Sequence, residues 1–269
     1  MKYCAATRSV HLARTVPPEI IKEHATETDR KIQACFAEIV ALSPSDVGPL
    51  QCYTLHAPGT FGGLGVRSLD NISAPAFWGG FAAAIKVMRI RSPGAVEKLL
   101  QRLQEGDVEG TTLEHLKKAD AELRAVNFDG PTIGNLLSSD VVVPNDPNEE
   151  ADPGEWVRGW QFKATRAKDK ANHTAKLRNA NPSVQAKLRS QGGVGAAAWL
   201  DARPVAPELR IPGNLFVAGL RYRSFLPMPL GDRHCPGATC GAQLDQWARL
   251  QAVKGGGAWG WRKRLSKSL

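Results

Sequence analysis

Apolar residues recur every three or four positions through much of the first 126 residues, which is the spacing of the buried face of an amphipathic helix. The first such run predicts a helix over residues 18–43, because Pro18 suits a first helical turn and Pro44 lies beyond the end. Its apolar stripe consists of Ile21, Ala25, Thr28, Ile32, Cys35, Phe36 and Ile39. Because Cys35 lies on this stripe, we expect it to be a small core residue.

Three more helices are predicted before residue 126. The nearly continuous apolar run at 74–85, APAFWGGFAAAI, predicts a buried helix. The run at 92–106 opens with a Ser-Pro pair, closes on a glycine and keeps its leucines on one face. The run at 111–126 has Thr111 and Glu114 at the spacing of a capping box, in which the two side chains bond to backbone N–H groups of the first turn.

The periodicity stops at residues 139–154, which are acidic and rich in Pro and Asn. Such a composition is typical of a flexible linker between domains. We therefore predict a mainly α fold with two small helical units, one at 1–138 and a basic one at 155–250. A basic tail at 251–269 is predicted to be disordered.

Positive charge gathers directly after the predicted linker. Nine Lys or Arg residues lie between Arg158 and Arg189, against the single acid Asp169. Near the end of the second unit, Asn214 is a candidate helix cap, and we expect Arg221 and Arg223 to point away from the apolar face of that helix. Basic residues with nearby aromatics are typical of backbone-phosphate binding, and a solvated helix face is the alternative.

The overall charge and the cysteine pattern narrow the class of protein. A net charge of +9 and a pI of about 9.5 favour an acidic partner such as nucleic acid. The five cysteines are odd in number and scattered, which argues against a disulfide framework. No signal-peptide core and no apolar run of membrane-spanning length is present, so we expect an intracellular protein, nuclear or cytoplasmic, without a membrane partner.

Four motifs occur in a characteristic order: TFGGLGVRSLDNISAPAFWGGFAAA, SQGGVGAAAWLDARP, FVAGLRYRSFLPMPL and CGAQLD. The glycines of the first, Gly62, Gly63 and Gly65, lack the spacing of a phosphate-binding loop and predict a tight structural turn. In this order the motifs resemble the region downstream of the polymerase core in non-LTR retrotransposon reverse-transcriptase polyproteins. The resemblance covers nearly all of residues 1–250.

The resemblance implies a thumb-like segment and the region that precedes an endonuclease, with a polymerase domain of the parent polyprotein as an expected partner. The polymerase needs closely placed aspartates to hold two Mg²⁺ ions, and this chain has no Asp-Asp pair. No endonuclease follows residue 250. Histidines are dispersed, without a His-Glu-x-x-His or Gly-x-Ser-x-Gly arrangement. We therefore expect neither an enzyme nor a cofactor.

The resemblance also implies a zinc knuckle near residue 240. The remaining candidate ligands are His234, Cys235 and Cys240, whereas Leu250 and Lys254 occupy the positions of the third and fourth ligands. Structural zinc requires four protein ligands, so we predict that no metal is held there.

These observations favour a non-catalytic, nucleic-acid-binding remnant of a retrotransposon polyprotein, with sequence-independent affinity for RNA or DNA. The residues expected to contact phosphate are Lys163, Arg166, Lys170, Lys176, Arg178, Arg221 and Arg223. The alternative is a helical scaffold, or degenerate gene product, that binds no ligand.

Overall fold

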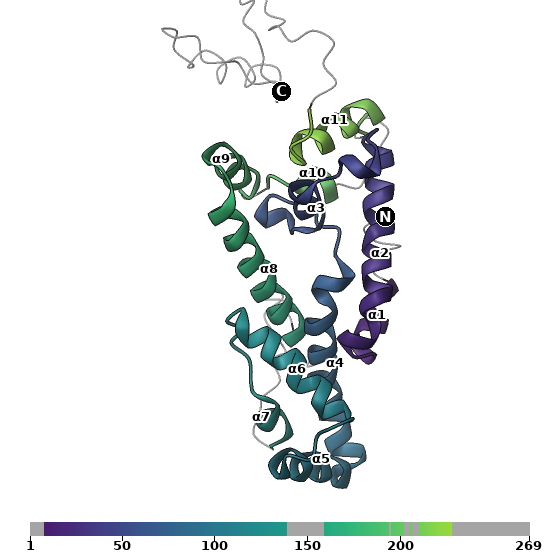
Figure 1. Ribbon diagram of the computed structural model, residues 1–269, viewed down its shortest axis with the longest axis vertical. Helices are drawn as coiled ribbons and strands as arrows, with labels where there is room; N and C mark the ends of the chain where they lie inside the picture. Colours follow the sequence, from purple (N-terminus) through teal and green to yellow (C-terminus); the bar gives the residue numbers. More distant parts are fainter. Residues whose placement is uncertain (1–7, 139–158, 194, 202–204, 206–209, 228–269) are drawn as a thin grey trace, which may run out of the picture.

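The computed structural model describes residues 8–138, 159–193, 195–201, 205 and 210–227 (Figure 1). These residues form α-helices and short 3₁₀ helices and include no strand, which confirms the mainly helical fold. The elements are α1 (Arg8–Thr15), α2 (Pro18–Ile39), η1 (Pro44–Asp46), α3 (Pro49–His56), η2 (Gly59–Phe61), α4 (Leu69–Arg91), α5 (Pro93–Glu105), α6 (Thr112–Ala125), α7 (Ile133–Leu137), α8 (Trp160–Asn179), α9 (Pro182–Gln191), α10 (Ala198–Asp201) and α11 (Gly213–Arg223). Among them, no helix combines the length and the apolar character that a bilayer crossing requires.

The long helix α4 lies at the centre of the fold, and α1, α2, α5, α6 and α8 pack against it (Figure 1). Its N-terminus is held by α2, where Asp29 accepts from Ser68 Oγ at 2.5 Å and from the Leu69 backbone N–H at 2.7 Å. Asp29 is buried, so a residue that resembles a solvent-facing acid in the sequence joins two helices instead. A carboxylate at a helix N-terminus also interacts favourably with the helix dipole.

Two consecutive glycines let two other helices approach α4 closely. A Cβ atom at Gly79 would lie 2.6 Å from Gln161 Cβ on α8, and one at Gly80 would lie 2.5 Å from the carbonyl oxygen of Arg14 on α1. Real Cβ atoms do not come this close, so larger side chains here would push both helices outward. The Gly-Gly pair thereby sets the junction of α1, α4 and α8.

The lower core is centred on three aromatic rings. Trp78 of α4 is fully buried and meets Phe128 edge to face at a centroid distance of 5.0 Å. Trp160, from the far side of the predicted linker, meets both rings at 6.3 Å. The Trp78 indole N–H donates to Asp120 Oδ1 at 3.0 Å, so the polar atom of this ring is satisfied.

The upper core also contains residues from before and after the predicted linker. Leu220 of α11 packs with Ile32 and Phe36 of α2, and Trp199 and Leu200 pack against the same cluster. The segments before and after the linker thus share their cores, and the predicted division into two units is not matched by a division of the core. The 139–154 linker and the 251–269 tail lie outside the described residues, so flexibility and disorder there stay predictions.

Several local predictions change in the structure. Cys35 is exposed, not buried, because it lies at the edge of the α2 stripe. The expected capping box does not form on α6: the Thr111 hydroxyl donates to the Val108 carbonyl, and Glu114 accepts from the Gly110 N–H instead of the Thr111 N–H. Helix α11 begins one residue before Asn214, without a side-chain cap.

Candidate nucleic-acid interface

The basic residues of α8 are divided between two faces of the helix. Lys163, Arg166, Lys170 and Arg178 are all exposed and follow one another at intervals of three, four and eight residues. Since residues three and four apart share a helix face, these four cations form one row along α8. We call them the α8 basic stripe. At 1.5 Å per residue, the stripe is about 22 Å long.

An open groove of about 560 Å³ runs beside the stripe and is lined by all four of its cations. Its opposite wall is the turn after α6, Val126 to Asp129, in which Asn127 adopts a left-handed conformation with φ of 57°. Between the cations, α8 contributes small side chains: Ala167, Ala171, Thr174 and Ala175. The groove is therefore shallow on its helical side and bordered by positive charge.

The stripe cations form no ion pairs with the acids that the structure describes. Among the residues that the structure describes, no acid lies within ion-pair distance of any stripe residue. Lys163 does lie over the Trp160 ring, 4.8 Å from its centroid. By contrast, the neighbouring Lys168 is paired with Glu122. One acid, the exposed Asp129, lines the groove and reduces its positive potential.

Lys176, the fifth α8 residue predicted to contact phosphate, lies on another face. Its ammonium donates to the Pro49 carbonyl at 3.4 Å and lies 5.7 Å from the centroid of the Tyr53 ring. A contact to a carbonyl and an aromatic face orients this lysine toward α3. The structure does not bring Lys176 together with the stripe.

The face of α8 opposite the stripe anchors the helix through buried polar contacts. Asp169 is buried and accepts from Arg67 Nη1 at 2.6 Å and from Asn71 Nδ2 at 3.2 Å. Burial raises the pKa of the Asp169 carboxyl, and the Arg67 side chain, which is 37% exposed, offsets this only in part. These contacts fix the rotation of α8 and so direct the stripe to solvent.

A histidine extends this anchored face toward α3 and η2. His173 Nδ1 lies 2.6 Å from Tyr53 Oη, and the His173 ring stacks on Phe61 at a centroid distance of 4.7 Å. Burial lowers the pKa of His173, with a smaller contribution from Arg189. Burial likewise raises the pKa of Tyr53, so the phenol is protonated at neutral pH. Which of the two groups donates depends on the His173 tautomer.

Arg223, which the sequence suggested as a phosphate contact, has a structural role instead. It is 3% exposed, and its guanidinium donates to the carbonyl oxygens of Gly63 (2.9 Å), Ala196 (3.0 Å), Gly59 (3.0 Å) and Gln191 (3.1 Å). Burial lowers its pKa from the usual arginine value. The prediction for this residue was wrong. The glycine-rich turn and the end of α9 supply carbonyl acceptors, and the sequence around Arg223 does not show that these segments lie beside it.

Arg221 is also engaged within the fold, though it is only half-buried. Its Nη1 donates to the Val40 carbonyl at 2.5 Å and its Nε to the Pro227 carbonyl at 2.8 Å. These bonds hold the end of α11 against the end of α2. We therefore leave both α11 arginines out of the candidate interface.

The metal candidates His234, Cys235 and Cys240 lie outside the described residues. Within the ranges that the structure covers, no group of three or more His, Cys, Asp or Glu side chains is placed to hold a metal ion. The sequence reasoning missed one part of the groove, the wall at 126–129, because its position beside α8 depends on packing between distant segments.

Comparison with known proteins adds no relative. No family model matches this chain, and no curated protein or solved structure is significantly similar to it.

Proposed function

We propose that this chain is a non-catalytic nucleic-acid-binding module that contacts the phosphate backbone through the α8 basic stripe, without regard to base sequence. Its resemblance to the post-polymerase region of non-LTR retrotransposon polyproteins supports this reading of the charge. The proposal includes an intracellular location, nuclear or cytoplasmic, and a polymerase domain as a protein partner.

The observation that carries the proposal is the row of four exposed cations, without acidic partners in the described residues, along one open groove. Like charges at these spacings destabilise an isolated helix, so their arrangement does not serve folding. A row of about 22 Å covers the rise of about six phosphates on one strand of a duplex. Phosphate contacts of this kind set affinity and position but carry no sequence information.

A second candidate, a protein-binding scaffold, is favoured by isolated apolar side chains on the surface. Ile90 at the end of α4 is 84% exposed, Ile20 on α2 is 66% exposed and Leu215 on α11 is 59% exposed. Exposed apolar groups are typical of protein contacts when they cluster. These three lie on different helices, which makes the scaffold the weaker candidate.

The experiment compares two variants of equal charge. The stripe variant carries Lys163→Gln, Arg166→Gln, Lys170→Gln and Arg178→Gln; the charge-matched control carries Lys22→Gln, Arg91→Gln, Lys98→Gln and Lys117→Gln, all at exposed positions away from α8. Each lowers the net charge by four, from +9 to +5. Binding of 20-mer oligonucleotides of unrelated sequence is measured by fluorescence anisotropy at low salt.

We expect the native chain to bind oligonucleotides of unrelated sequence with similar affinity. The control should bind them about as tightly as the native chain does. The stripe variant should bind at least about a hundredfold more weakly, because four phosphate contacts and their released counterions are lost. No binding by the native chain would favour the scaffold. Equal weakening in both variants would mean that net charge, not the stripe, sets the affinity.

A further inference from the structure

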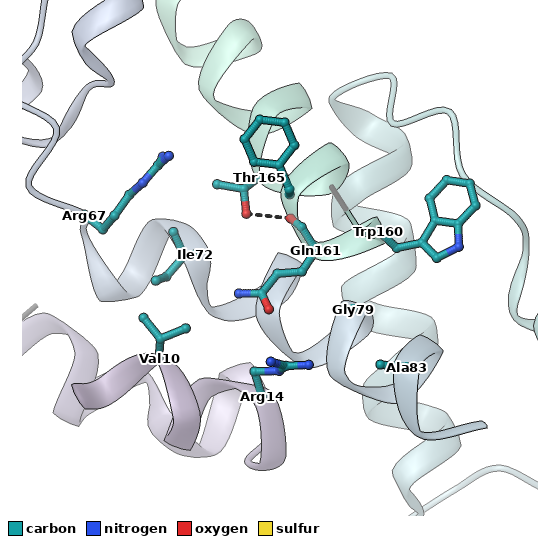
Figure 2. Close-up of a pocket in the computed structure, with 11 residues that line it drawn as sticks. Val10, Arg14, Arg67, Ile72, Gly79, Ala83, Trp160, Gln161 and Thr165 are labelled. Atoms are coloured by element: carbon teal, nitrogen blue, oxygen red, sulfur yellow. Dashed lines mark hydrogen bonds between the residues drawn. The ribbon is translucent and has the colours of Figure 1, made fainter. Parts of the chain in front are cut away.

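A second cavity, of about 480 Å³, lies where α1, α4 and the first turns of α8 meet (Figure 2). Its residues come from each of these helices and from the segment before α4: Val10, Arg14, Arg67, Ile72, Gly79, Ala83, Gly159, Trp160, Gln161, Phe162 and Thr165. Gly79 forms part of the wall at a position where α8 approaches α4 closely. A cavity of this size is in the range that binds small molecules.

The polar groups of this cavity include an arginine that the fold leaves available. Arg14 is exposed and has no acidic partner among the residues that the structure describes. Figure 2 shows the Gln161 amide and the Arg14 guanidinium pointing toward one another. The Thr165 hydroxyl is already committed, since it donates to the Gln161 carbonyl at 2.8 Å. Arg14 and the Gln161 amide are therefore the groups placed to bind a ligand.

The second arginine of the cavity contributes no net charge. Arg67 is paired with the buried Asp169 at 2.6 Å, so the two charges cancel. Among the cavity residues that the structure describes, Arg14 is the one that keeps a positive charge without an acidic partner. A single charge of this kind suits a monoanion, such as a carboxylate or a sulfonate, better than a dianion.

The remaining lining is apolar. Val10 and Ile72 face the cavity from α1 and α4, and Ala83 and Phe162 complete the apolar surface. The Trp160 ring turns away from the cavity and belongs to the lower core instead (Figure 2). We infer that this cavity binds a small amphiphilic monoanion, with its anionic group on Arg14 and Gln161 and its apolar body against Val10, Ile72 and Phe162.

This site is separate from the proposed nucleic-acid surface. Gln161 and Thr165 are four residues apart on one face of α8, whereas Lys163 and Arg166 lie on the opposite side of the helix. A ligand in the cavity and a nucleic acid on the stripe therefore do not compete for the same atoms. The inference goes beyond the proposed function and does not depend on it.

The test uses 8-anilinonaphthalene-1-sulfonate, a monoanion with an apolar body, titrated into the full chain and followed by fluorescence. Arg14→Gln removes the charge and Ala83→Leu fills the exposed rim of the cavity. Arg91→Gln and Ala84→Leu are the matched controls, since both positions are exposed on α4 and neither lines the cavity. N-phenyl-1-naphthylamine supplies the same apolar body without charge.

We expect Arg14→Gln and Ala83→Leu each to raise the Kd for the sulfonate at least about tenfold, and the controls to change it less than about twofold. Arg14→Lys, which keeps the charge, should retain most of the affinity. The neutral probe should bind weakly, and its affinity should not change with the substitutions at Arg14. Equal sulfonate affinity in every variant would overturn the inference. Displacement of the sulfonate by a saturating oligonucleotide would also overturn it, because the cavity would then belong to the nucleic-acid surface.

Discussion

On α11, the Arg223 guanidinium is buried and donates to four backbone carbonyls, whereas on α8 the cations of the basic stripe are exposed and none has an acidic partner in the described ranges. Both helices carry basic residues that the sequence suggested as phosphate contacts. The difference arises from what lies opposite: α11 faces the glycine-rich turn, whose carbonyls need donors, and the α8 stripe faces an open groove.

A basic helix indicates a binding surface only where the fold leaves its donors unused. Removing a buried arginine that donates to carbonyls strongly destabilises the fold, because each carbonyl loses its hydrogen-bond partner away from water. Removing an exposed cation changes the stability of the fold little, but it weakens nucleic-acid binding if that cation contacts a phosphate.

The largest expected effect is that of Arg223→Ala. The substitution leaves the carbonyls of Gly59, Gly63, Gln191 and Ala196 without this donor, so we expect a loss of about 3–5 kcal/mol in the free energy of unfolding. Urea denaturation followed by circular dichroism measures it. A loss below about 1 kcal/mol would mean that water replaces the guanidinium, and Arg223 would again be a candidate for the interface.

A smaller effect, with a definite sign, is expected on the buried face of α8. Because burial raises the pKa of Asp169, this group stabilises the fold below its unfolded pKa of about 4 and loses that contribution as the pH rises through the folded value. Asp169→Asn removes the titration. As the pH rises from the unfolded pKa of Asp169 through its folded pKa, the native chain should lose stability and the variant should not. The free energy of unfolding of the variant should therefore increase relative to that of the native chain.

The pH series of urea denaturations also tests which contact dominates at Asp169. If the variant instead becomes less stable relative to the native chain as the pH rises, the ion pair with Arg67 outweighs the cost of burial. Asn71→Ala is the companion variant, since it removes a hydrogen bond to the same carboxylate without removing the charge.

The smallest effect on stability is expected from the stripe variant itself. Its four substitutions lie at exposed positions, and they relieve repulsion between Lys163, Arg166 and Lys170, which are three and four residues apart. We expect the free energy of unfolding to change by less than about 0.5 kcal/mol. A loss comparable to that of Arg223→Ala would show that the stripe, too, is part of the structural framework.

The sequence predicts the helices well where the apolar period is long. The spacing of residues 92–106 predicts α5, including its closing Gly106 with φ of 78°. On α8, where apolar residues are few, the sequence grouped Lys176 with the four stripe residues, and the structure places it on another face. Contacts between distant segments are missed: Asp29 caps α4, and Arg223 serves the Gly59–Phe61 turn. Periodicity reports which face of a helix is buried, and not which groups the buried face will meet.

The most direct test of the central claim is the salt dependence of oligonucleotide binding by the native chain, the stripe variant and the charge-matched control. If the stripe contacts phosphates, the slope of log K against log salt concentration becomes shallower by about 0.7–0.9 for each stripe cation removed, and the control keeps the native slope. The stripe variant should therefore lose about 3 to 4 from the slope. An unchanged slope in the stripe variant, or the same decrease in the control, would contradict the assignment of nucleic-acid binding to α8.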